Sequence, residues 1–83
     1  MGIEELLARV PEGWTRVRFE DTTYGLSRTG RVGGRGVTVY AEQLDGPDVV
    51  SANVYRTASG SVLKPCEMPA EKVLAFLRGW QPY

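Results

Sequence analysis

The middle of the chain, from Val37 to Arg56, alternates between apolar and polar residues on both sides of Asp45-Gly46-Pro47-Asp48. Neighbouring side chains of a strand point to opposite faces of a sheet, so this alternation predicts two half-buried strands. Asp, Gly and Pro favour turns, and they predict an antiparallel hairpin with a four-residue loop. In that register the facing pairs are Leu44 with Val49, Ala41 with Ala52, Val39 with Val54 and Val37 with Arg56.

A second hairpin is predicted upstream, where apolar and charged residues alternate on the N-terminal side of Asp21-Thr22. With Asp21-Thr22 as a two-residue turn, Phe19 would face Tyr24 and Val17 would face Leu26. Large apolar groups again fall on one side of the sheet. Asp-Thr is not the favoured sequence for a tight hairpin turn, so either a strained turn or a bulge is expected.

The two ends of the chain carry the i, i+3, i+4, i+7 apolar spacing of amphipathic helices. The first predicted helix runs from Ile3 to Val10 and ends at Pro11, and the second begins at Pro69 and ends at Gly79. Residues 62–64 are interpreted as an extended connector, with a short fifth strand as the alternative. Residues 30–36 are rich in glycine and predict a flexible loop.

These elements predict a single α+β domain over residues 1–83, built as a four-stranded antiparallel meander with both helices packed on its apolar face. Three aromatic residues are expected at the border of the core: Trp14, Tyr24 and Trp80. The predicted core consists of Ile3, Leu6, Leu7, Val10, Val17, Phe19, Leu26, Val37, Val39, Val54, Val73, Phe76 and Leu77.

Composition restricts the chemistry open to this chain. It has 83 residues, no histidine and one cysteine, with ten Lys and Arg balanced by ten Asp and Glu. Without histidine the commonest general base and metal ligand are missing, so we expect a non-enzymatic protein without metal or cofactor. Zero net charge argues against nonspecific nucleic-acid binding, although a local patch of cations could still act. The acidic N-terminus and the lack of a long apolar run predict a cytoplasmic protein with no membrane partner.

The polar side of the predicted sheet is the first candidate site, because no helix remains to cover it. We expect it to bind a protein partner or a second copy of the chain, with single-stranded nucleic acid as an alternative, since arginine and tyrosine side chains can stack on bases. A merely solvated face would carry the same pattern. The candidate binding residues are Arg16, Arg18, Thr38, Tyr40, Glu42, Ser51, Asn53 and Tyr55.

Two further candidates lie outside the strands. Arg31 and Arg35 belong to the glycine-rich segment, where exposed amides and guanidinium groups could receive a phosphate, or where the segment could simply connect two hairpins. Cys66 stands just before the second helix, and a thiol near a helix N-terminus can become more acidic. Thiol-dependent redox chemistry at Cys66 is therefore an alternative function, although a lone cysteine is often only a small apolar residue.

Three segments carry a resemblance to known proteins: VTVYAEQL, DVVSANVYR and LKPCEMPAEKVLAFLRGW. At these segments it resembles a group of short, uncharacterised bacterial proteins, mostly from high-GC genomes, and the resemblance is expected to cover nearly the whole chain. Some members of that group are labelled peptide methionine sulfoxide reductase. Such reductases use motifs such as GCFWG, whereas Cys66 lies in KPCEMP, so the resemblance implies a stand-alone domain and assigns no catalytic residue.

Overall fold

The computed structural model describes residues 2–83, except for the side chain of Val32. Its α-helices are α1 (Ile3–Ala8) and α2 (Ala70–Gly79), and a 3-10 turn, η1, spans Val32–Gly34. Its strands are β1 (Gly13–Phe19), β2 (Thr22–Gly30), β3 (Gly36–Gln43), β4 (Val49–Thr57), β5 (Gly60–Pro65) and β6 (Gln81–Pro82).

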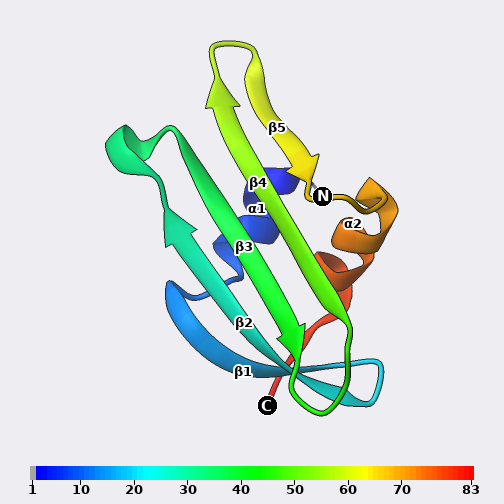
Figure 1. Cartoon of the computed structure of the whole chain (residues 1–83). Helices are drawn as coiled ribbons and strands as arrows, with labels where there is room; N and C mark the ends of the chain where they lie inside the picture. The colour runs from blue at the N-terminus through cyan, green and yellow to red at the C-terminus, as the bar shows by residue number, and fades with distance from the viewer. Residues whose placement is uncertain (1) are drawn as a thin grey trace.

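The strands form one antiparallel sheet in the order β5-β4-β3-β2-β1-β6, and both helices lie on the same side of it (Figure 1). The predicted α+β class, with an antiparallel sheet and two helices, is confirmed. The predicted number of strands is wrong, because there are six rather than four. Segment 62–64, interpreted as a connector, belongs to β5 and pairs with β4. After α2 the chain returns to the other edge, where β6 pairs with β1.

The register of the central hairpin differs from the predicted one by two residues. Val39 pairs with Ala52, and Glu42 and Val49 form the last pair before the loop. The Leu44 amide bonds to the carbonyl of Thr23 on β2 at 2.9 Å, so Leu44 leaves the hairpin and the loop is longer than four residues. Two residues is the side-chain period of a strand, and the shift therefore leaves every side chain on its predicted face.

The first hairpin shows the same kind of shift. Phe19 pairs with Thr22 rather than with Tyr24, and the two-residue turn is Glu20-Asp21 rather than Asp21-Thr22. Both turn residues have positive φ, 49° and 64°, which are the values of a type I′ turn. That turn matches the right-handed twist of the flanking strands, which offsets the cost of left-handed backbone at two residues other than glycine.

The core lies between the helices and the facing side of the sheet, which we call the inner face. The members are mostly those predicted, but Ile3 and Phe19 are only partly buried, while Tyr24 and Trp80 are fully inside. Trp14 is wrongly placed at the core border, because it lies on the opposite face. The buried residues are Leu6, Leu7, Val10, Val17, Tyr24, Leu26, Val37, Val39, Ala41, Val50, Ala52, Val54, Val73, Phe76, Leu77 and Trp80.

Two arginines attach the C-terminal ends of the helices. Arg28 on β2 donates from Nη1 to the carbonyl oxygens of Leu7 and Val10, at 2.9 and 3.1 Å. Arg9 donates to the carbonyl oxygens of Leu77 and Trp80, at 3.2 and 3.3 Å, at the end of α2. The last carbonyls of a helix lack partners within the helix and carry partial negative charge, so a guanidinium group satisfies them well.

A smaller polar contact attaches the loop of the central hairpin to α2. Asp48 accepts hydrogen bonds from the Tyr24 hydroxyl at 2.7 Å and from the Lys72 ammonium at 2.6 Å. The bond from Lys72, followed by that from Tyr24, lowers the pKa of Asp48 below its ordinary value. Burial, helped by the bond to Asp48, raises the pKa of Tyr24 to about 12.

Candidate binding face of the sheet

The outer face is the side of the sheet opposite the helices. Its strand residues alternate with the buried ones, and the register aligns Thr38 with Asn53 and Tyr40 with Ser51 on neighbouring strands. The Thr38 hydroxyl donates a hydrogen bond to Asn53 Oδ1 at 2.7 Å. All eight predicted strand residues lie on this face: Arg16, Arg18, Thr38, Tyr40, Glu42, Ser51, Asn53 and Tyr55.

Trp14 belongs to the outer face although the sequence reasoning did not place it there. Its indole ring lies over Gly25, because a Cβ built on that glycine would be 2.6 Å from the ring nitrogen and 2.9 Å from Cε2. The side chain is nonetheless 56% exposed, so the other surface of the ring is open. Trp14 is three residues from the buried Val17 on the same strand, so alternation places the two side chains on opposite faces. The large apolar ring of tryptophan led us instead to expect it at the border of the core.

Three more side chains of the outer face were missed for a different reason. Val62 and Lys64 face outward on β5, where they pair with Tyr55 and Asn53. Tyr83 follows β6, and its ring lies 5.0 Å from the Arg16 guanidinium. These residues reach the face only through strand pairing at the two sheet edges, which the sequence indicated for residues 62–64 only as the alternative to a connector and did not indicate for Tyr83.

Four aromatic side chains are exposed on the outer face. Tyr83 is 67% exposed, Tyr40 is 40% exposed and Tyr55 is 37% exposed, in addition to Trp14. Aromatic residues gathered on one side of a soluble protein are characteristic of contact surfaces, because elsewhere their apolar rings would be buried.

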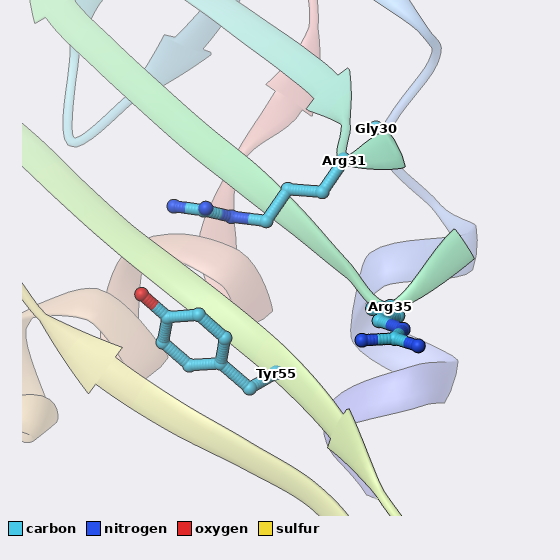
Figure 2. Close-up of a pocket in the computed structure, with 4 residues that line it drawn as sticks. All are labelled: Gly30, Arg31, Arg35 and Tyr55. Atoms are coloured by element: carbon cyan, nitrogen blue, oxygen red, sulfur yellow. The ribbon is translucent and has the colours of Figure 1, made fainter. Parts of the chain in front are cut away.

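A hollow of about 530 Å³ lies where the outer face meets η1, lined by Gly30, Arg31, Arg35 and Tyr55. Figure 2 shows the Arg31 side chain extending along the sheet toward Tyr55, and its guanidinium is 5.1 Å from the ring centroid. The segment predicted to be a flexible loop contains η1, and the Arg31 amide bonds to the carbonyl of Gly36 at 2.9 Å. The hollow is open to solvent and brings both loop arginines of the sequence prediction together with Tyr55.

Charge is distributed unevenly over the two sides of the molecule. The outer face and the hollow carry five cationic side chains, whereas Glu42 is the single carboxylate among the outward-facing strand residues of the described chain. On the inner side, carboxylates form ion pairs, as Glu4 does with Arg56 at 3.0 Å. The cations of the outer side are Arg16, Arg18, Arg31, Arg35 and Lys64.

Cys66 lies apart from this arrangement of cations and rings, between β5 and α2. Its backbone amide continues the pairing of β5 with β4 by bonding to the carbonyl of Ser51 at 3.0 Å, and the residue is exposed. Within residues 2–83 no group of three His, Cys, Asp or Glu side chains is arranged to bind a metal ion. The structure therefore gives Cys66 a place at the edge of the sheet, next to the end of β5.

Comparison with known proteins gives no relative: no protein-family model, curated protein or solved structure matches the chain. Over the described residues, neither helix has the length and apolar character needed to cross a membrane. A functional interpretation of this chain therefore depends on the geometry of the outer face.

Proposed function

We propose that the protein is a small non-enzymatic binding protein that contacts its partner with the outer face of its sheet. The observation that carries the proposal is the exposure of Trp14, Tyr40, Tyr55 and Tyr83 on one side of a sheet whose helices cover the other side. Burying an aromatic ring away from water is favourable in free energy, and a partner that covers these exposed rings would gain that free energy.

The rigidity of the scaffold supports a preformed contact surface. The residues behind the outer face are fully buried, and the helices are attached through Arg9 and Arg28. Side chains on packed strands keep their positions better than side chains on loops, which lowers the entropy lost on binding. The open face can therefore bind without a large rearrangement of the domain.

Position-specific photo-crosslinking in cells that express the protein tests the proposal. A benzophenone amino acid replaces Tyr40 in one variant and Ala75, an exposed position of α2, in a matched control. We expect a discrete crosslinked species from position 40 that is absent from position 75, and that weakens when Arg18 is replaced by Ala. Equal crosslinking from the two positions, or none from position 40, would contradict binding by the outer face.

A further inference from the structure

We infer that the occupant of the outer face is a single strand of nucleic acid, whose bases stack on the exposed rings and whose phosphates contact the arginines. The inference rests on the proposed function and adds the chemical class of the partner. It combines three observations: the charge of the face, the placement of its rings and the arginine-lined hollow.

The excess of cations on the outer face favours a polyanionic partner. The outward-facing strand residues and the hollow carry five cations, and the strand residues contribute one carboxylate, so a polyanion gains favourable electrostatic contacts along the strands and at the hollow. A second copy bound through the same face would bring together two surfaces that each carry an excess of cations, and like charges across an interface are repulsive. The zero net charge of the chain hides this excess, because most carboxylates lie outside the outward-facing strand positions; Glu5 on α1 and Glu71 on α2 are examples.

The rings are arranged for stacking on unpaired bases. Trp14 pairs with Ser27, which pairs in turn with Tyr40, so the two aromatic residues share one row across the sheet, two strands apart. Two strand spacings put their Cα atoms about 10 Å apart, and the indole itself lies toward Gly25, the residue paired with Glu42. Gly25 leaves room for the indole to lie over the strand with its other surface open. Bases offer flat surfaces of this kind only when they are unpaired, which favours a single strand over a duplex.

The hollow beside η1 provides a phosphate contact at one end of the face. Arg31 lies beside the Tyr55 ring, and Arg35 lines the same hollow from the other end of η1 (Figure 2). A guanidinium group can donate two parallel hydrogen bonds to one phosphate, and here an aromatic ring adjoins it. Acidic turn residues, Glu20 and Asp21 among them, lie at the opposite end of the sheet from η1 (Figure 1).

Fluorescence anisotropy with labelled oligonucleotides tests the inference directly. The probes are single strands of DNA and of RNA, each about twelve nucleotides long, and a DNA duplex of the same length. We expect both single strands to bind more tightly than the duplex. The logarithm of the binding constant should fall with the logarithm of salt concentration, at about 0.7 per phosphate contact and so at most about 3.5 for five cations.

Two variants and one control locate the binding. Tyr40→Ala should weaken single-strand binding by about tenfold or more, because one stacked base is lost. Arg31→Ala should reduce the salt slope by about 0.7. Arg78→Ala removes the same charge from the exposed surface of α2 and should change neither quantity. Denaturation curves of all three variants establish that each is folded under the assay conditions.

Several results would overturn the inference. Equal affinity for the duplex would refute stacking, and unchanged binding in Tyr40→Ala and Arg31→Ala would refute this location. If no oligonucleotide binds while position 40 still gives a discrete crosslink in cells, the partner is not a nucleic acid although the proposed function stands. If light scattering shows a dimer and position 40 crosslinks to a second copy, the occupant is the chain itself.

Discussion

Replacing Gly25 by alanine should disturb Trp14 without unfolding the protein. The added Cβ would be 2.6 Å from the indole nitrogen and 2.9 Å from two ring carbons. Favourable non-bonded separations are about 3.5–4.0 Å, so the ring must move by about 1 Å or leave the strand. The ring is already 56% exposed and can move into solvent.

The expected change in stability is small because two effects oppose each other. Losing contact over roughly 40 Å² of apolar surface costs about 1 kcal/mol. Alanine is favoured over glycine in a strand by about 0.5–1 kcal/mol, through the smaller entropy of the unfolded chain. The free energy of unfolding of Gly25→Ala should therefore stay within about 1 kcal/mol of the original protein, measured by urea denaturation.

The ring itself should respond clearly. We expect the tryptophan emission of Gly25→Ala to shift to longer wavelength and to be quenched more easily by acrylamide, and single-strand affinity to fall. Trp14→Phe gives the contribution of the buried Trp80 for subtraction. Gly30→Ala, on the same strand with nothing within 4 Å of its Cβ, is the matched control for the indole and should change neither the emission nor the acrylamide quenching. Unchanged emission in Gly25→Ala, or a loss of about 3 kcal/mol or more, would refute the placement of the indole over Gly25.

Two further predictions concern the inner side of the molecule. Arg28→Ala should lower the free energy of unfolding, measured by urea denaturation, by about 1.5–3 kcal/mol, because carbonyl oxygens at the end of α1 lose a charged donor. The control Arg78→Ala should change this free energy little. Equal losses in the two variants would contradict the role of Arg28. The raised pKa of Tyr24, about 12 against an ordinary 10.0, stabilises the fold fully below pH 10, and this contribution is lost as pH rises through about 12. The lowered pKa of Asp48 stabilises the fold above pH 3.8, its ordinary pKa, and this contribution to stability is lost as pH falls through the pKa of the folded state. Tyr24→Phe should remove the alkaline loss from a stability profile and the last tyrosine step from an absorbance titration, and persistence of both would show that another group is responsible.

The two register errors have one physical cause. Alternation has a period of two residues, so it assigns a face to every side chain but cannot distinguish registers that differ by two. The turns select the register. Glu20 and Asp21 adopt positive φ, and Leu44 bonds to Thr23 on another strand instead of continuing the hairpin. The first of these choices is favoured by the twist of the flanking strands and not by the turn residues themselves, and the second depends on a strand that is distant in sequence.

The candidate site was predictable to the extent that it follows from alternation. Tyr40 and Tyr55 could be assigned to the outer face from the spacing of their apolar neighbours. Tyr83 could not, because its neighbouring strand β6 forms only by pairing at the edge of the existing sheet, and Val62 could be assigned only under the alternative of a fifth strand. Trp14 obeys the alternation, but its exposure depends on the missing side chain of Gly25 on the neighbouring strand.

The sequence alone determined which side chains can share a face, because side-chain direction along a strand or helix is a local property of the backbone. It also determined that cations and carboxylates are equal in number. Only the tertiary structure decided where those charges act. Arg9 and Arg28 became partners of helix carbonyls that are distant in sequence, while Arg16 and Arg31 stayed beside exposed rings. Which groups lie beside each charge is set by the tertiary fold. A chain with equal numbers of cations and carboxylates therefore has a cationic outer face.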